Sequence, residues 1–171
     1  MEVRDSLPVH DVPASAEQLA AKPLLRITGL VADPKELSLA DLAPLPRSTF
    51  TEDFRCEDNW SVPKQKWSGI RLADVLALAR PLPQARYVRV GSGDYVAPIS
   101  LSDARAALLC DSLNDQPLTV RNGAPWRLSS PGAACFASVK WVDRLELTAE
   151  PGANDAERIT RERTGPKAGQ R

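Results

Sequence analysis

Proline limits the length of the secondary structure elements in this chain more than any other residue type. The sequence holds 15 prolines in 171 residues, well above the usual share of roughly 5%. Proline cannot donate a backbone hydrogen bond, so it disrupts the interior of a helix or a central strand. The chain is therefore expected to form many short elements joined by stiff turns. It is long enough to bury a core without metal or disulfide staples.

Hydrophobic periodicity predicts an α+β fold of mixed β-sheets with a few short helices. Strands are expected at residues 24–31, 48–54, 87–90, 95–99, 117–120, 125–130 and 138–149. Helices are expected after Ser38, after a turn at Gly69, and after Ser100. Ser38 and Ser100 each precede an aspartate by three residues, which is typical of a capping box. The segment after Ser100 also carries an apolar stripe at residues 101, 104, 108 and 109, so it is the clearer of the two helices.

The chain divides into an N-terminal arm, a domain and a C-terminal tail. Residues 1–23 mix prolines with charge and are expected to lie over the domain, which spans 24–149. From residue 150 to 171 only Ile159 is a large apolar side chain. A segment with so little apolar surface is expected to be mobile.

The net charge bears on which partners the protein can bind, and the N-terminal sequence bears on where the protein is located. Twenty-two basic and 22 acidic residues cancel, so neither nucleic acid nor an anionic membrane is expected as a partner. No apolar run approaches the length of a membrane span. The N-terminus shows no export signal, so a cytoplasmic location is expected for the chain as given, or a periplasmic one if a leader was removed.

Three cysteines, Cys56, Cys110 and Cys135, make an odd number without CxxC spacing. Neither a disulfide framework nor a zinc site is indicated, and reduced thiols are predicted. Cys56 stands in "DFRCEDNWS". Its thiolate would suit a soft metal, but only with sulfurs that a cofactor supplies. A nucleophile would need a base, and the single histidine, His10, lies in the arm. The alternative is a packed, inert thiol.

A second candidate site lies in the last third of the chain. "NGAPWRLSSPGAACFASVKW" places Arg127, Ser138 and Lys140 around a Pro-Gly loop. An arginine fork, a lysine and loop amides are groups that bind phosphate. The alternative is that these basic residues are solvated at strand ends.

Taken in order, several segments resemble the molybdopterin-binding domain of the sulfite oxidase family. They are "RITGLV", "LSLADLAPLP", "DFRCEDNWS", "GIRLADVL", "NGAPWRLSSPG" and "SVKWV", within residues 24–147. The resemblance is greatest to the small bacterial branch that includes the catalytic subunit of periplasmic methionine sulfoxide reductase. It implies an oxidoreductase with molybdenum and molybdopterin as cofactors.

The resemblance also implies roles for single residues. Cys56 falls on the family's one protein ligand to molybdenum, with the other sulfurs supplied by the pterin dithiolene. Arg127, Ser138 and Lys140 fall on positions that hold the pterin and its phosphate. Asn122 stands where many members have histidine; its amide can bond the pterin but cannot become cationic.

Asp58 and Tyr95 are the candidate catalytic residues near the substrate. Asp58 falls on an acidic position close to the metal, and Tyr95 is a candidate donor to a metal-bound group, with a rim hydroxyl as the alternative. Glu57 and Asp58 replace the anion pocket of sulfite-oxidising members and would repel sulfite. Two-electron oxygen-atom transfer on a small, neutral sulfoxide or N-oxide is therefore the predicted activity.

Two further expectations concern what the chain lacks. It has no haem domain, so electrons are expected from an external transfer partner. The alternative function is a cofactor-free binding module that keeps the fold, suggested by Asn122 and by the altered "PGAACFA" loop.

Overall fold

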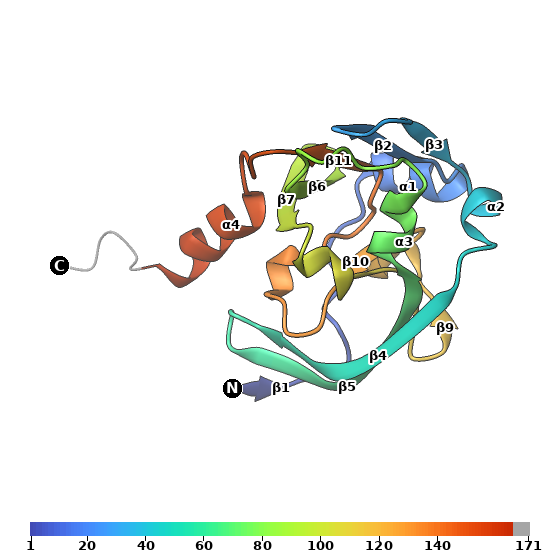
Figure 1. Ribbon diagram of the computed structural model, residues 1–171. Coiled ribbons are helices and arrows are strands. Elements are labelled where there is room, and N and C mark those ends of the chain that lie inside the picture. The colour runs from blue at the N-terminus through green and yellow to red at the C-terminus, as the bar shows by residue number, and fades with distance from the viewer. Residues whose placement is uncertain (166–171) are drawn as a thin grey trace.

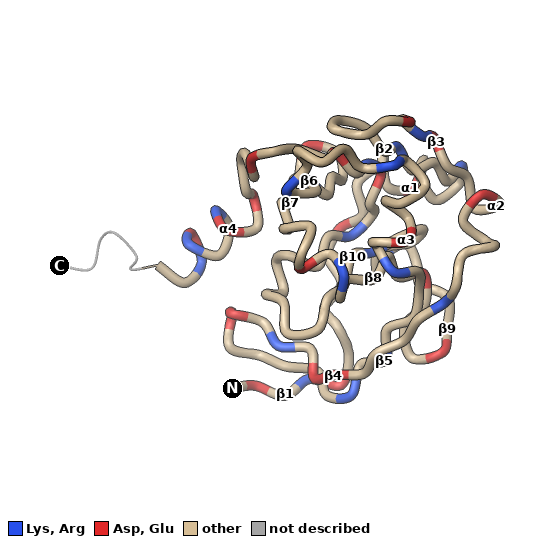
Figure 2. Tube along the Cα trace, in the orientation of Figure 1, with Lys and Arg blue, Asp and Glu red and all other residues tan. Residues whose placement is uncertain are grey.

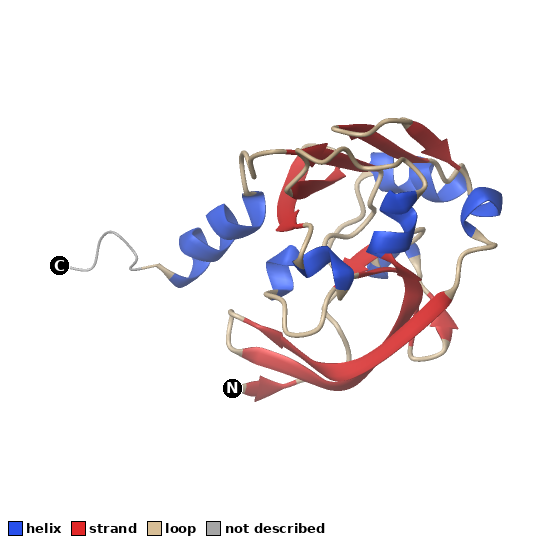
Figure 3. Cartoon of the chain, viewed as in Figure 1, coloured by secondary structure: helices blue, strands red, loops and turns tan. Residues whose placement is uncertain are grey.

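Two β-sheets face each other across a layer of short helices and loops (Figure 1). The structure, a computed structural model, describes residues 1–165. Strands gather at two opposite sides of the molecule, and helices lie between them and at its periphery (Figure 3). This arrangement confirms the α+β fold of mixed sheets with a few short helices.

The first sheet has the strand order β1-β5-β8-β10, with β4 paired to β5 and β9 paired to β8. Its strands are β1 (Glu2–Val3), β4 (Arg47–Cys56), β5 (Trp60–Arg71), β8 (Leu108–Leu113), β9 (Gln116–Pro117) and β10 (Arg127–Ser129). The long β4–β5 hairpin crosses one whole side of the molecule (Figure 1). The tip of this hairpin carries the sequence "CEDNW".

The second sheet has the order β3-β2-β11-β6-β7. Its strands are β2 (Leu25–Gly29), β3 (Lys35–Leu37), β6 (Tyr87–Ser92), β7 (Tyr95–Ser100) and β11 (Arg144–Thr148). Strand β11 pairs in parallel with β2 and antiparallel with β6, so the end of the domain is inserted beside its beginning. The predicted hairpin around residue 93 is confirmed as β6 and β7.

Within residues 1–165, six helical segments lie between strands, and a seventh, α4, follows the last strand. The α-helices are α1 (Ala14–Ala21), α2 (Leu39–Leu42), α3 (Leu72–Ala77) and α4 (Asp155–Thr164), and the 3-10 turns are η1 (Asp103–Arg105), η2 (Val120–Asn122) and η3 (Cys135–Ala137). The capping box before α2 is confirmed, because Ser38 and Asp41 exchange both hydrogen bonds. In the part of the chain that is described, no helix has the length and apolar character of a membrane span.

Two predicted elements were wrong for the same physical reason. The capping bonds between Ser100 and Asp103 form, but only η1 follows, and Leu108 begins strand β8. Gly69, predicted as a turn before a helix, lies inside strand β5, where a Cβ would lie 2.2 Å from the carbonyl oxygen of Leu109. Pairing of β8 with β5 and β10 therefore outweighs the local preference for helix.

Two other segments also differ from the sequence-based expectation. Residues 117–120 were predicted as a strand, but the structure has only the end of β9 and then η2 there. The tail expected to be mobile contains helix α4, which Asn154 caps by accepting a hydrogen bond from the Glu157 amide. Ala156 is buried at 7% exposure, so this helix packs through its small residue as well as Ile159. Residues 166–171 of the tail lie outside the described residues.

Candidate cofactor site

A cavity of about 960 Å³ opens beside Cys56. Its walls come from the N-terminal arm, the β4–β5 tip, the β6–β7 turn, the loop between β10 and β11, and helix α4. The lining is mainly aromatic and aliphatic: Leu7, Pro8, Pro13, Phe54, Trp60, Tyr95, Phe136, Val139, Trp141 and Ile159. Its charged members are Arg4, Asp11, Asp58, Asp94, Arg127, Lys140 and Arg163, together with His10.

Cys56 ends strand β4 and is buried, with 8% of its surface exposed. The tight turn that follows places Asn59 at a φ of 68°, and the Asn59 amide donates to the Cys56 carbonyl. Asparagine tolerates this left-handed conformation better than most residues. Phe54 and Trp60 stack across the hairpin with ring centroids 5.9 Å apart. The cysteine is therefore presented from a rigid aromatic platform.

Cys56 is joined to Cys135 of η3 by a disulfide, with Cα atoms 5.0 Å apart and a sequence separation of 79. The prediction that all three thiols are reduced is therefore wrong. Sequence spacing gave no sign of this pair, because the loop that carries Cys135 reaches Cys56 only in the folded chain. Cys110 remains free and fully buried, and desolvation raises the pKa of its thiol to about 12.

Arg127 is the buried cation of the site, with 4% exposure. Its Nε donates to Ser138 Oγ at 2.9 Å and its Nη1 to the Asn122 carbonyl at 3.2 Å. The guanidinium lies 4.9 Å from the centroid of the Trp67 ring. Desolvation lowers its pKa to about 10, and in residues 1–165 no carboxylate forms an ion pair with it. A buried, unpaired cation facing a cavity fits an anionic ligand.

Lys140 is the second unpaired cation that lines the cavity. Its ammonium donates to the Arg121 carbonyl at 2.9 Å, and burial followed by repulsion from Arg127 lowers its pKa to about 8. Ser138 also lines the cavity and donates to the Leu128 carbonyl. The structure thus brings Arg127, Ser138 and Lys140 together, as predicted from their place in the chain.

Asn122 is not among the described residues that line the cavity, and its predicted hydrogen bond to the pterin stays a prediction. Its carbonyl instead supports Arg127 from behind. Its side-chain Oδ1 is buried without a hydrogen-bond partner within the described chain. A buried acceptor left without a donor costs free energy, so this position is unfavourable in the protein without ligand.

The two acids after Cys56 are both engaged. Asp58 accepts from Arg163 Nη1 at 2.9 Å, and Glu57 accepts from the Cys135 amide at 3.3 Å. Arg4 lies nearby, 4.9 Å above the Trp60 ring. The charge of Asp58 is therefore compensated by Arg163, whereas Glu57 forms no ion pair in the described chain, so the predicted repulsion of sulfite is weakened but not abolished.

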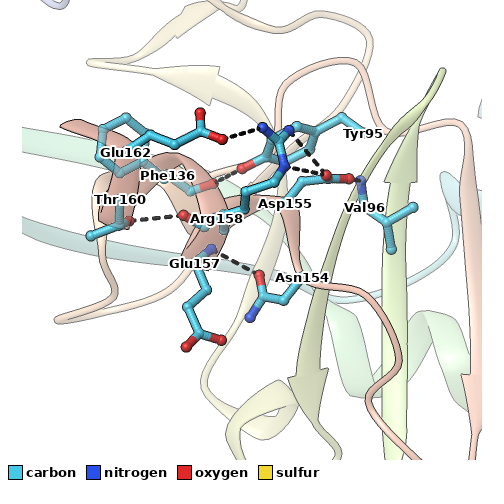
Figure 4. A network of polar contacts seen from close by, with 10 residues as sticks. Tyr95, Val96, Phe136, Asn154, Asp155, Glu157, Arg158, Thr160 and Glu162 are labelled. Atoms are coloured by element: carbon cyan, nitrogen blue, oxygen red, sulfur yellow. Dashed lines mark hydrogen bonds and ion pairs between the residues drawn. The ribbon is translucent and has the colours of Figure 1, made fainter. Parts of the chain in front are cut away.

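Tyr95 lines the cavity, but its hydroxyl donates to the Phe136 carbonyl at 2.5 Å (Figure 4). Desolvation, with the Asp155 charge, raises the pKa of Tyr95 to about 12. The hydroxyl thus holds the β10–β11 loop, and its role as a donor to a metal-bound group stays a prediction.

Sequence reasoning missed the walls that the arm and α4 provide. Arg4 and His10 line one side of the cavity, and Ile159 and Arg163 line another. Asp155 anchors α4 by accepting from the Val96 amide at 2.9 Å (Figure 4). The one available signal was the spacing of Ala156, Ile159 and Arg163, which share a helical face.

The fold and this site define a domain that binds an anionic cofactor beside a cysteine. The family described as "Oxidoreductase molybdopterin binding domain" matches residues 10–156. The chain belongs to this family of oxidoreductases, and its cofactor is molybdenum with molybdopterin. This match, together with a sulfite oxidase among the relatives, confirms the resemblance to the sulfite oxidase family. The buried Arg127 and the half-buried Lys140, both without a carboxylate partner in the described chain, have the charge that the phosphate of that cofactor requires. An open cavity with both cations on its wall gives no support to a cofactor-free module.

Several known proteins are similar to this chain. It is 31% identical over 129 residues to the uncharacterized oxidoreductase YuiH of Bacillus subtilis, covering 74% of this chain and 65% of YuiH. It is 30% identical to sulfite oxidase of Arabidopsis thaliana, covering 72% and 41% of the two chains. It is 26% identical to the protein-methionine-sulfoxide reductase catalytic subunit MsrP of Campylobacter jejuni, covering 72% and 48%. The chain thus spans less than two thirds of these relatives.

A solved structure shares the fold. The sulfane dehydrogenase SoxCD from Paracoccus pantotrophus superposes with a TM-score of 0.69 at 24% identity, covering 74% of this chain and 38% of the other. The matched family ends at residue 156, so Ile159 and Arg163 of α4 lie beyond it.

Proposed function

We propose that this domain catalyses two-electron oxygen-atom transfer on a small, neutral substrate, with sulfoxide or N-oxide reduction favoured over sulfite oxidation. The observation that carries the proposal is the lining of the cavity. Aromatic and aliphatic side chains dominate the walls around Cys56, and such walls favour a substrate with apolar groups. The C. jejuni relative is named as a protein-methionine-sulfoxide reductase, which agrees with this choice of substrate.

The charges of the cavity divide between cofactor and substrate. Among the arginine and lysine side chains that line the cavity, Arg127 and Lys140 are the two without a carboxylate partner in the described chain, and we assign them to the cofactor phosphate. Arg163 and Asp58 neutralise each other at the opposite wall. Asp11 and Asp94 also line the cavity and form no ion pair in the described chain, so the remaining charge disfavours an anion such as sulfite and a neutral oxo donor is the better match.

The chain's residues position the reactants, and the cofactor, when bound, would supply the two-electron redox chemistry of oxygen-atom transfer. Cys56 would provide a thiolate ligand to the molybdenum once its disulfide is reduced. Trp60 and Phe136 would pack against the substrate and exclude water. Asp58 is near enough to the cavity to hold a proton or orient a polar substrate group. Electrons would come from an external partner protein.

Expression with an intact molybdopterin pathway tests the proposal. The purified protein is expected to contain about one molybdenum and one pterin per chain by elemental and pterin analysis. With a reduced viologen dye it is expected to reduce dimethyl sulfoxide or trimethylamine N-oxide faster than it oxidises sulfite with ferricyanide. Metal-loaded protein that oxidises sulfite faster would reverse the substrate assignment.

Cys56→Ser tests the metal ligand separately. We expect a fall in turnover of at least about a hundredfold, or ~2.7 kcal/mol in the barrier, and loss of the thiolate-to-metal absorption band. Cys110→Ser is the matched control, because that thiol is buried away from the cavity lining. An unchanged absorption band in Cys56→Ser would show that Cys56 is not a ligand to the metal.

A further inference from the structure

The cysteine proposed as metal ligand is the same one that the structure shows in a disulfide. Cys56 is buried at the tip of β4, whereas Cys135 is half-buried in η3. Both line the cavity. A Cα separation of 5.0 Å lies within the range in which a disulfide forms without backbone movement. A sulfur bonded to Cys135 cannot at the same time donate a thiolate to a metal.

Hydrogen bonds independent of the disulfide hold the two cysteines together. Glu52 of β4 accepts from the Gly132 amide at 2.9 Å, and Glu57 accepts from the Cys135 amide. On the other side of the loop, Tyr95 donates to the Phe136 carbonyl. Two contacts thus dock the loop on the β4–β5 hairpin, and a third fixes it to strand β7. Cys135 therefore stays beside Cys56 when both sulfurs are reduced.

We propose that Cys56 and Cys135 form a reversible dithiol–disulfide couple, and that its oxidation withholds Cys56 from the molybdenum cofactor. The oxidant is a low-molecular-weight disulfide such as oxidised glutathione. The Cys135 thiolate, the more exposed of the two, attacks it and releases one thiol, which leaves a mixed disulfide on Cys135. The Cys56 thiolate then attacks that Cys135 sulfur and releases the second thiol. Overall, two protein thiols and one small disulfide give one protein disulfide and two small thiols.

Reduction by a small thiol or dithiol runs the same exchange backwards and frees Cys56. The redox couple requires nothing beyond the two sulfurs, whereas its effect on cofactor binding rests on the proposed role of Cys56 as metal ligand. These two parts are tested by different measurements, so either can fail alone.

Peptide mapping tests the couple itself, on full-length protein from cells that lack molybdopterin synthesis. Trypsin is expected to leave each cysteine in its own peptide, at residues 56–64, 106–121 and 128–140. After oxidised glutathione, the first and third peptides should be linked under non-reducing conditions, while the Cys110 peptide stays alkylatable in denaturant. After dithiothreitol, all three peptides should be alkylated. Three free thiols after oxidation, or glutathione bound without a linked pair, would overturn the couple.

Cofactor addition tests the consequence. Oxidised and reduced apoprotein, freed of reagents, receive molybdenum cofactor released from a denatured molybdoenzyme. Reduced protein should develop the thiolate-to-metal absorption band, and oxidised protein should show less than a tenth of it until dithiothreitol is added. Cys135→Ala should develop the band whether or not oxidised glutathione is present. An equal band in the oxidised and reduced wild type would overturn the withholding of Cys56.

The outcomes separate this inference from the proposed function. If reduced wild type takes up no molybdenum while the linked peptides form, the assigned metal ligand fails and the couple stands. If molybdenum binds but no linked peptides form, the couple fails and the proposed function stands.

Discussion

The two sheets of this domain bury different kinds of side chain. The second sheet holds the larger core, in which Leu25, Ile27, Val88, Val90, Leu145 and Leu147 are all fully buried. The smaller cluster under the first sheet mixes apolar groups with a buried arginine, a disulfide and aromatic rings. One of these rings, Trp67, has a buried Nε1 with no partner in the described chain.

This difference indicates that stability is concentrated away from the site. The second sheet buries aliphatic side chains, each of which stabilises the fold by about 1.5–3 kcal/mol. The first sheet keeps a desolvated cation, Arg127, on the cavity wall, where an anionic ligand would compensate its charge. Charges on the rest of the chain are interspersed (Figure 2), so the unpaired pair Arg127 and Lys140 stands out by its burial.

The largest expected effect comes from truncation in the second sheet. Leu145→Ala removes a fully buried side chain that pairs with Ile27 and Val90. We expect the free energy of unfolding to fall by about 2–5 kcal/mol, measured by urea denaturation. Leu39→Ala is the control, because Leu39 is 53% exposed, and it should change stability by less than about 0.5 kcal/mol. Equal losses in both variants would contradict this picture of the core.

Arg127→Met should weaken cofactor binding and leave the stability of the cofactor-free protein nearly unchanged. The free energy of unfolding of the cofactor-free variant is expected to stay within about 1 kcal/mol of the wild-type value. The reason is that the variant no longer buries a charged guanidinium, which offsets the hydrogen bonds that it loses. Retention of cofactor should fall at least about tenfold, or ~1.4 kcal/mol. Pterin content after dialysis measures the retention. A variant that loses stability as Leu145→Ala does, yet keeps its pterin, would show Arg127 to be structural.

Lys140 should give a smaller, pH-dependent effect. Its pKa is about 8 in the folded protein against an ordinary value of 10.5, so the unfolded chain binds more protons between these values. Stability of the cofactor-free protein should therefore rise from pH 8 to 10.5. The cofactor phosphate should bind more weakly over the same range as the ammonium loses its proton. Urea midpoints of wild type minus those of Lys140→Met isolate this contribution, and a flat difference would contradict it.

The smallest expected effect is at the rim. Arg163→Gln breaks the exposed ion pair with Asp58, so stability should change by less than about 1 kcal/mol. The KM for a neutral sulfoxide should change about two- to fivefold with little change in kcat, because the variant alters the cavity wall. Arg161→Gln is the matched control: Arg161 also pairs on α4, with Glu157, but lies outside the cavity lining. Equal KM values in both variants would show that α4 does not take part in substrate binding.

Elements stabilised within a few residues were predictable. The capping box of α2, the β6–β7 hairpin and helix α3 follow from side chains near one another in sequence. The segment from Ser100 to Leu109 was not predictable in this way. Its capping bonds are local, but Leu108 and Leu109 are buried by strands that lie far away in the chain.

The candidate site shows the same division. The family resemblance carried by "GAPWRL" and "SVKW" predicts that Arg127 and Lys140 hold the cofactor, whereas an arginine and a lysine beside a Pro-Gly loop could, by spacing alone, equally be solvated at strand ends. Their desolvation and lack of acid partners required the fold. The position of Asn122 behind Arg127, and the pairing of Asp58 with Arg163, also depended on packing.

The sequence by itself determined the family, the short elements expected from so many prolines, and the chemistry of the side chains available. Only the tertiary structure decided which of them meet: Cys56 with Cys135, the arm and α4 with the cavity, and β11 with β2. The physical reason is the distance along the chain between the residues that interact. Caps and turns depend on hydrogen bonds three or four residues apart, whereas a sheet joins segments whose encounter depends on burying the whole core.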